Sequence, residues 1–460
     1  MNYFDAADVP FIRREYPIGG AFLQRFTGMD RAELRALQNR RFMQVLAFAW
    51  QVPFYQRLWG AAGVKRDDVR SLDDIARLPH YDKSDLMASV EAHPPLGDFH
   101  GRDVHPAERR PPIIMHTTSG TTGRPQPLLF GPKSREIQNA LLARAHLLQG
   151  MTADDVVHSV YGFGMVNGGH YIRESILHWI GAQFLPAGTG VETRSQQQVA
   201  LMRDFQVNVL VGFGDFIKRL AEVARENGIE PGRDIRLRMV SGLVGPDAHA
   251  PISQAWGGCE VYDWYGVGDT GIIACDGRER DGMHVFEDAQ YLEVIDAASG
   301  RAVADGESGD MICTCLFKDD IFPIIRFNTH DVTRPLAGES PLKLPFRRIA
   351  GFLGRSDNMV KLRGINLYPT SVGVLLTAER GEFTGEYICE VRRSGTRDEM
   401  TVRCEIRGAA SDGLRQAYED LLRARLGVEV RVELCAPGVL ADLTEVDQRQ
   451  KPVRLRDLRV

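Results

Sequence analysis

Apolar residues recur at helical spacing near the start of the chain. Between residues 32 and 58 they fall three or four positions apart, which is typical of a helix with one buried face. These positions are Leu34, Leu37, Phe42, Val45, Leu46 and Ala49. Ser71 begins a second, short helical pattern that ends at a proline-marked turn, and its hydroxyl is suited to cap that helix. The pattern predicts a helical scaffold ahead of the main domain.

Between residues 111 and 331 short β-rich runs alternate with helical stretches. The runs are IIMHT, VVHSVYGF, VNVLVGF, LRMVSGL and CEVYDWYG, and the helical stretches include REIQNALLARAHLLQG and FIKRLAEVARENG. Such alternation predicts parallel strands joined by crossover helices, with ligand loops at the carboxyl ends of the strands. After MHVFED the strands become shorter, which indicates a small β-rich unit.

Around residue 354 the chain becomes rich in glycine, polar and charged residues. The remainder forms a βαββα-like run over VGVLLTA, GEYICEVRR, EMTVRCEIRG, LRQAYEDLLRARLG and VEVRVEL. We therefore predict an α/β protein with a large N-terminal domain, residues 1–355, and a small α+β domain, residues 356–460. About 100 residues is an ordinary size for such a domain.

Composition narrows the class of protein. The chain has 460 residues, of which 43% are hydrophobic and 25% charged, and its net charge is -5. These values are typical of a folded globular protein. Basic residues are scattered rather than gathered in a stripe, so we expect no nucleic-acid partner. Neither an export signal nor a membrane span is evident, and we expect a cytoplasmic protein with reduced cysteines and no membrane partner.

A Ser/Thr/Gly-rich segment follows the apolar run PIIM. It comprises His116, Thr117, Thr118, Ser119, Gly120, Thr121, Thr122, Gly123 and Arg124. The glycines permit a tight turn and close approach to a polyanion, while the hydroxyls and Arg124 can donate to phosphate oxygens. The spacing differs from the G-x-x-x-x-G-K-[ST] loop of kinases and GTPases. An ordinary surface loop is the alternative.

The segment TTSGTTGRP resembles the signature loop of the adenylate-forming superfamily. His116, LPHYDKSDL upstream and YGFGMVNGGHY at 161–171 are similar to the phenylacetate-CoA ligase branch, and the resemblance extends from about residue 35 to Val460. It implies an enzyme that uses ATP and Mg²⁺ to join a carboxylic acid to AMP. It further implies transfer of the acyl group to coenzyme A, giving a thioester.

Two further motifs match the nucleotide site of that superfamily. In DWYGVGDTG, Tyr265 and Gly266 are expected to lie against the base, and Asp269 takes the position of a magnesium-holding Glu. In PIIRFNTHD, Asp331 takes the position that binds the ribose, although Asn328 and His330 stand where Arg and Gly are usual. We interpret His330 as a structural histidine.

The resemblance also assigns residues around the domain junction. It implies that Arg355 reaches the ribose or a phosphate, that Asp357 is the hinge, and that Gly364 lines a pantetheine channel. Lys451 falls on the catalytic lysine, whose ammonium stabilises charge between carboxylate and α-phosphate. The expected catalytic set is Lys451, His116 and Asp269.

Four residues suggest a structural zinc site. Cys313 and Cys315 alternate on one strand and can face the same ion, and Cys275 with His284 completes a Cys₃His set. Buried cysteines without metal are the alternative.

The sequence gives the least information about the identity of the acyl group. The resemblance implies an aryl or heteroaryl acid in an aromatic-lined pocket. The expected lining residues are Tyr161, Phe163, Gly168, Phe213, Ser241 and Gly242, with Met165, Asn167, His170 and Tyr171 beside them. Where related ligases carry an Ala-Glu-Pro turn, this chain has Leu243-Val244-Gly245-Pro246.

Two other functions remain open at this point. One is an adenylating enzyme that passes the acyl group to a carrier-protein thiol or an amine. The other is a nucleotide-binding regulatory module without chemistry, which the unusual Asp269, Asn328 and His330 would favour. A homodimer is also left open.

Overall fold

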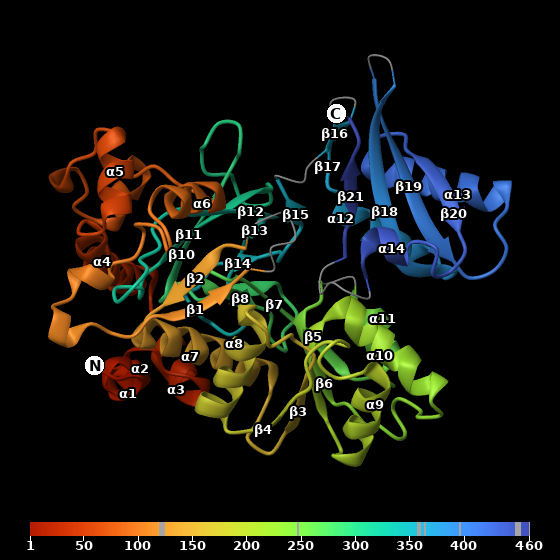
Figure 1. The fold of residues 1–460 in the computed structure, drawn as a ribbon, viewed down its shortest axis with the longest axis horizontal. Helices are drawn as coiled ribbons and strands as arrows, with labels where there is room; N and C mark the ends of the chain where they lie inside the picture. Colours follow the sequence, from red (N-terminus) through yellow and green to blue (C-terminus); the bar gives the residue numbers. More distant parts are fainter. Residues whose placement is uncertain are drawn as a thin grey trace.

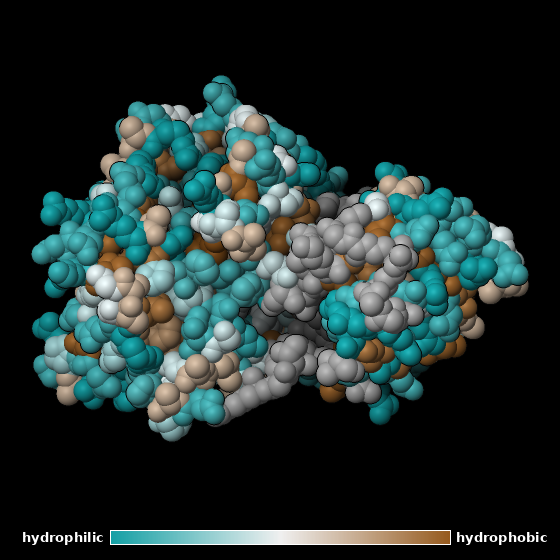
Figure 2. Space-filling model, turned by 90° about the horizontal axis from the view of Figure 1, so that it is seen from above, coloured by the Kyte–Doolittle hydropathy of each residue, from teal (hydrophilic) through white to brown (hydrophobic). Residues whose placement is uncertain are grey.

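The computed structural model describes residues 1–118, 125–245, 248–356, 360–362, 365–394, 397–446 and 452–459. The chain forms a large body and a smaller one, which holds the C-terminal residues (Figure 1). Figure 2 shows both bodies from above, with hydrophilic residues over most of the visible surface. The predicted large and small parts are therefore both present.

Helices build the N-terminal scaffold. They are α1 (Tyr3–Ala7), α2 (Val9–Glu15), α3 (Gly19–Phe26), α4 (Arg31–Ala49), α5 (Pro53–Ala61) and α6 (Lys83–Ala92). The single helix expected over residues 32–58 is two helices, because Pro53 lacks an amide hydrogen and opens α5 at its first position. Asp30 and Glu33 form a capping box at the start of α4. Ser71 caps a short 3₁₀ helix, Leu72–Arg77, as expected.

A nine-stranded sheet forms the centre of the large body. Its order is β13 (Pro335–Leu336), β14 (Arg348–Ile349), β9 (Met283–Val285), β8 (Gly271–Cys275), β7 (Glu260–Val267), β6 (Met239–Leu243), β5 (Val209–Phe213), β3 (Val156–Ser159) and β4 (Gln183–Pro186). Strands β4, β3, β5, β6 and β7 run parallel. From β7 onward the pairing is antiparallel. The predicted parallel arrangement is confirmed for residues 156–267.

Helices cover both faces of the parallel strands. They are α7 (Pro132–Gln149), α8 (Asn167–Ser175), α9 (Ser195–Asp204), α10 (Gly214–Glu226) and α11 (His249–Ala255). Val209 and Val211 belong to the core that includes α7, whereas Leu210 belongs to the core that includes α9, α10 and α11. This alternation follows from the two-residue period of a strand.

The strand before the phosphate loop lies outside the parallel sheet. β1 (Ile114–Thr117) pairs with β2 (Pro127–Phe130) as an antiparallel hairpin. The small β-rich unit is a separate four-stranded sheet in the order β10 (Gln290–Ile295), β11 (Gly309–Cys315), β12 (Phe327–Thr333) and β15 (Gly354–Arg355).

The small body has its own sheet and core. The sheet order is β20 (Arg431–Cys435), β19 (Arg397–Ile406), β18 (Phe383–Ser394) and β21 (Leu455–Asp457), with β16 (Val360–Leu362) and β17 (Ile365–Leu367) as a separate pair. Its helices are α12 (Pro369–Glu379), α13 (Asp412–Leu426) and α14 (Ala441–Thr444). VGVLLTA, expected at the start of the run as a strand, is helical, because Pro369 opens a helix whose Val372 and Leu376 enter this core.

Two ion pairs join the bodies along α10. Arg454 Nη2 lies 3.4 Å from Asp215 Oδ2, and Arg407 Nη2 lies 3.4 Å from Glu222 Oε1.

In the part of the chain that the structure describes, no helix is long and apolar enough to cross a membrane.

Candidate active site

The hairpin β1–β2 presents the phosphate-loop segment. Thr118 and Gln126 face each other at the loop end of the hairpin, where Thr118 N donates to Gln126 O at 3.1 Å and Gln126 N donates to Thr118 Oγ1 at 3.1 Å. Thr117 N donates to Met165 O at 2.7 Å, so the hairpin is held against the 161–171 segment. Ser119, Gly120, Thr121, Thr122 and Gly123 lie outside the described residues.

His116 stacks on His170. The ring centroids are 4.8 Å apart, and Phe163 lies edge-on to His170 at 5.6 Å. Burial, together with the positive charge of Arg135, lowers the pKa of His116 to about 4. His116 is therefore neutral at physiological pH, which suits contact with a substrate better than donation of a proton.

Asp269 lies at the end of β7, where its carboxylate is buried. Gln126 Nε2 donates to Asp269 Oδ1 at 2.6 Å, and Lys318 Nζ donates to Asp269 O at 2.8 Å. Burial raises the pKa of Asp269, although the charge of Lys318 opposes this. The sequence reasoning missed Gln126 and Lys318, since neither belongs to a motif; Lys318 is fully buried over the rings of Phe130 and Phe322.

Tyr265, Asp331 and Arg355, which the sequence assigns to the nucleotide site, come together from three strands. Tyr265 Oη donates to Asp331 Oδ2 at 2.7 Å, and Arg355 Nη1 donates to Asp331 Oδ1 at 2.8 Å. Burial and the adjacent carboxylate raise the pKa of Tyr265 well above its ordinary value, so its hydroxyl stays a donor. A side chain at Gly266 would place Cβ 2.4 Å from Gly271 O, which explains the glycine.

The expected acyl-pocket residues gather at the carboxyl ends of β5 and β6. Tyr161 packs edge-on against Phe213, with centroids 4.8 Å apart, and a Cβ at Gly168 would lie 3.4 Å from the Tyr161 ring. At Gly242 a Cβ would lie 1.8 Å from Gly212 O, so only glycine fits between these strands. Ser241 points the other way, where its hydroxyl donates to Gln149 Oε1 at 2.6 Å inside the core.

A buried carboxyl pair supports the turn that replaces Ala-Glu-Pro. Asp263 accepts hydrogen bonds from the amides of Val244 at 3.1 Å and Gly245 at 2.9 Å. Its own amide donates to Asp276 Oδ1 at 2.9 Å. Burial raises the pKa of Asp263 to about 7, and burial with the proximity of Asp263 raises that of Asp276 to about 8.

The zinc prediction is wrong for the four residues on which it was based. Cys275 and His284 are neighbours on β8 and β9, but His284 Nε2 faces Ser340 Oγ at 2.6 Å. Cys313 and Cys315 lie on β11 in the other sheet, where their thiols face Gln290 Oε1 and Thr270 O. Among the described residues no three His, Cys, Asp or Glu side chains form a group that could hold a metal.

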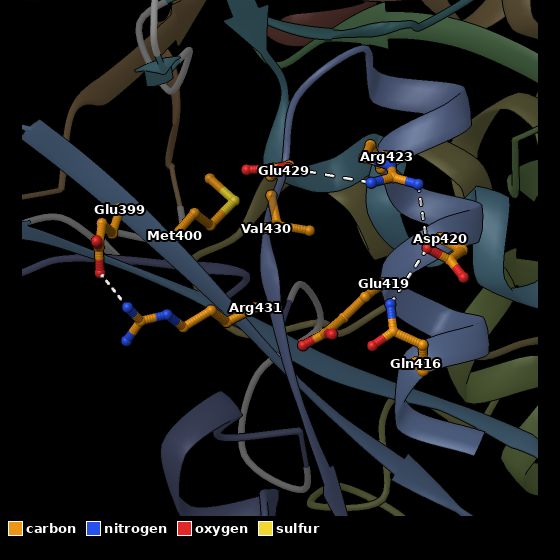
Figure 3. A pocket seen from close by; sticks show the side chains of 9 residues that line it. All are labelled: Glu399, Met400, Gln416, Glu419, Asp420, Arg423, Glu429, Val430 and Arg431. Carbon is orange, nitrogen blue, oxygen red and sulfur yellow. Dashed lines mark hydrogen bonds and ion pairs between the residues drawn. The ribbon is translucent and has the colours of Figure 1, made fainter. Parts of the chain in front are cut away.

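Three further expected residues, Asp357, Gly364 and Lys451, lie outside the described residues. A hollow of about 310 Å³ on the small body (Figure 3) contains none of the expected site residues. Its charged side chains pair with one another, as Arg431 does with Glu399 at 3.0 Å and Arg423 with Asp420 at 3.3 Å. We therefore place the candidate site at the strand ends and not in this hollow.

Comparison with known proteins places the chain in a family. The model of the AMP-binding enzyme matches residues 42–314, and that of the AMP-binding enzyme C-terminal domain matches residues 364–459. A phenylacetate-coenzyme A ligase of Aromatoleum evansii is 30% identical over 441 residues, which cover 91% of this chain and 95% of the relative. The chain therefore belongs to the AMP-binding enzyme family, in its phenylacetate-CoA ligase branch. It is an AMP-forming acid–CoA ligase that works through an acyl-adenylate.

Solved structures of a related ligase in two states differ in their similarity to this chain. 2-Hydroxyisobutyryl-CoA ligase in the postadenylation state, in complex with 2-HIB-AMP, has a TM-score of 0.82 at 29% identity, covering 94% of this chain and 91% of that chain. The same enzyme with 2-HIB-AMP and CoA in the thioesterification state has a TM-score of 0.67 at 30% identity, covering 95% and 92%. The arrangement of the two bodies thus agrees better with the postadenylation state.

Proposed function

We propose that the acid this ligase activates is aromatic or heteroaromatic. The observation that carries the proposal is the presence of two groups of ring side chains among the expected pocket residues. Tyr161 packs against Phe213, and His170 contacts both His116 and Phe163. A flat apolar acid gains most from contact with such rings, because ring pairs add to the energy of area burial.

The related proteins differ in their acids. The curated relatives are named for phenylacetate, whereas the solved relative is named for 2-hydroxyisobutyrate. A pyrophosphate-exchange assay over phenylacetate, other aromatic and heteroaromatic acids, 2-hydroxyisobutyrate and straight-chain acids separates these classes. We expect kcat/KM for the best aromatic acid to exceed that of every aliphatic acid at least about tenfold, a difference of roughly 1.4 kcal/mol. A preference for an aliphatic acid would overturn the proposal.

We also propose that the site binds Mg²⁺, and the chemistry of Asp269 fits this ion. Asp269 offers a carboxylate oxygen, which is a hard ligand of the kind that Mg²⁺ prefers. Because the side chain is buried, its negative charge costs free energy unless a counter-charge lies beside it. The ion would neutralise phosphate charge on the bound nucleotide. Asp269→Asn keeps the size of the side chain and removes its charge, so we expect a raised Mg²⁺ requirement in pyrophosphate exchange with an unchanged KM for the acid. Unchanged Mg²⁺ dependence would argue against this role.

The residue roles divide between the two half-reactions. In our proposal His116, Thr117, Thr118 and residues 119–123 hold phosphate and acid, Tyr265 and Gly266 face the base, and Asp331 and Arg355 hold the ribose. Lys451 acts in adenylation, while Gly364 lines the path of the CoA thiol. The division of the chain at residues 355 and 356 is supported by β15, which pairs with β12 of the large body, and by the separate core that includes Val360.

A carrier-protein thiol or an amine would be an acceptor in addition to CoA, and the relatives, which are CoA ligases, do not favour it. Mass-spectrometric detection of acyl-CoA, set against acylation of an added carrier protein, tests whether the enzyme uses such a second acceptor. Gel filtration tests the homodimer that the sequence left open.

A further inference from the structure

His330 lies between two carboxylates from different parts of the large body. His330 Nε2 is 2.9 Å from Asp82 Oδ2, and its Nδ1 is 3.6 Å from Asp310 Oδ2. The Asp82 carboxylate also caps α6 through the amides of Ser84 and Asp85. The hydrogen bond from His330 holds the pKa of Asp82 well below its usual range. The imidazole therefore connects β12 with the start of α6.

The backbone conformation of His330 supports its role in connecting these elements. Its φ is +56°, in the left-handed region that disfavours most side chains, and such a residue persists only when its surroundings hold it. Asn328 Oδ1 accepts the His330 amide hydrogen at 2.8 Å, and Asn328 Nδ2 donates to Asp310 Oδ2 at 3.4 Å. Asn328 and His330, which stand where Arg and Gly are usual in the superfamily, thus belong to one network.

The same network holds the last described residue before the small body. Ser356 N donates to His330 O at 2.8 Å, and Ser356 Oγ donates to Asp310 Oδ2 at 2.9 Å. Ser356 Oγ also lies 3.4 Å from His330 Nδ1. Ser356 extends the pairing of β15 with β12 by one residue, whereas Val360 already packs in the core of the small body. The connection between the bodies therefore starts directly after Ser356.

We propose that His330 is a positioning residue that, through Asp82, Asp310 and Ser356, fixes the large-body end of the connection to the small domain. The inference rests on the proposed roles in the two half-reactions, and a related ligase is known in a postadenylation and a thioesterification state. While Ser356 is fixed, it stays with the large body when the small domain rotates. Without His330, Ser356 moves with the small domain while Arg355 stays on Asp331, and the arrangement that forms the thioester is reached less efficiently.

The test compares two half-reactions in His330→Ala and Asp82→Asn. Asn remains a good helix cap, so Asp82→Asn weakens the contact with His330 while preserving α6. We expect pyrophosphate exchange to stay within about twofold of wild type in both variants. Single-turnover thioester formation from preformed acyl-adenylate should fall by about fivefold or more. The double variant should lose little beyond His330→Ala, since both changes act on the contact between His330 and Asp82.

His93→Ala is the matched control. His93 also pairs with an aspartate, Asp98, at 3.5 Å, but it follows the opposite end of α6 and its side chain is 51% exposed. We expect no change in either half-reaction. If His330→Ala and Asp82→Asn leave thioester formation unchanged, or slow both half-reactions equally, the proposed role is wrong.

Hydrogen exchange provides a readout that needs no substrate. The Ser356 amide should exchange faster in His330→Ala and Asp82→Asn than in wild type or His93→Ala, because its acceptor, His330 O, is then less well held. Unchanged exchange would overturn the positioning role even for a protein without ligase activity. Absence of pyrophosphate exchange in wild type with every acid would instead contradict the proposed function and leave this measurement valid.

Discussion

Arg355 Nη1 lies 2.8 Å from Asp331 Oδ1, which ties the last strand of the large body to the carboxylate proposed to hold the ribose. The Asp331 side chain is 8% exposed and that of Arg355 35%. In our proposal, nucleotide binding and the position of the domain connection are therefore linked through this ion pair.

Asp331→Asn should weaken nucleotide binding. The amide keeps the shape of the side chain but loses the charge-assisted bond with Arg355 and one acceptor for the ribose. We expect KM for ATP to rise at least about tenfold in pyrophosphate exchange, roughly 1.4 kcal/mol, with little change in KM for the acid. An equal change in both KM values would indicate a general disturbance of the site.

Lys451→Ala should separate the half-reactions. The ammonium is proposed to stabilise charge as the carboxylate approaches the α-phosphate, so adenylation should fall by about a hundredfold or more. Thioester formation from supplied acyl-adenylate should change by less than about threefold. Lys65→Ala, at a surface position before a short helix, is the control and should leave both rates unchanged. Normal adenylation in Lys451→Ala would contradict the mechanism.

Asp276→Asn should change how stability depends on pH. The pKa of Asp276 is raised to about 8 in the folded chain, above that of an unfolded aspartate. Between about pH 4 and pH 8 the folded state binds more protons than the unfolded state, so this group lowers stability as pH rises. Asn does not ionise, so the variant does not lose stability through this group as pH rises. We expect Tm to increase by a few degrees at pH 8 and less at pH 5.

The control for this measurement is Asp305→Asn, an exposed aspartate in a turn. Its Tm should follow wild type at both values of pH. An Asp276→Asn protein whose Tm falls equally at pH 5 and pH 8 would show that hydrogen bonding, and not ionisation, dominates at this position.

Gly242→Ala should prevent proper pairing of β5 and β6. The added Cβ would lie 1.8 Å from Gly212 O, and both residues sit in paired central strands. We expect a loss of several kcal/mol, above the roughly 1–3 kcal/mol typical of overpacking, because backbone atoms must move. Gly164→Ala meets nothing within 4 Å and should leave urea denaturation unchanged. A Gly242→Ala protein of wild-type stability would show that the strands can separate at little cost.

Much of the fold was predictable because its signals are local. The alternation of β-rich runs and helical stretches predicted the parallel strands from Val156 to Val267, since each run must be buried on both faces. The motifs around Tyr265 and Asp331 predicted a nucleotide site, and the two side chains do meet. Two prolines also carried a local signal, since Pro53 opens α5 and Pro369 opens α12 in the small domain. The sequence prediction followed the spacing of apolar residues instead and missed both helix starts.

The zinc prediction failed for a physical reason. Spacing on a strand determines which way a side chain points but not which sheet lies opposite. Cys313 and Cys315 face Gln290 and Thr270, whereas Cys275 and His284 lie in the other sheet. The buried Lys318 was likewise invisible, because a lone lysine in a sequence is usually a surface residue.

Sequence alone determined the alternation of strands and helices between residues 156 and 267, the place of the phosphate-loop segment in the chain and the resemblance to the family, because these depend on residues close together in the chain. Only the tertiary structure decided which distant residues meet. Asp82 and His330 are 248 positions apart, and Asp269 and Lys318 belong to different segments. Their contacts arise from the packing of α6 and two sheets, which no local pattern of residues specifies.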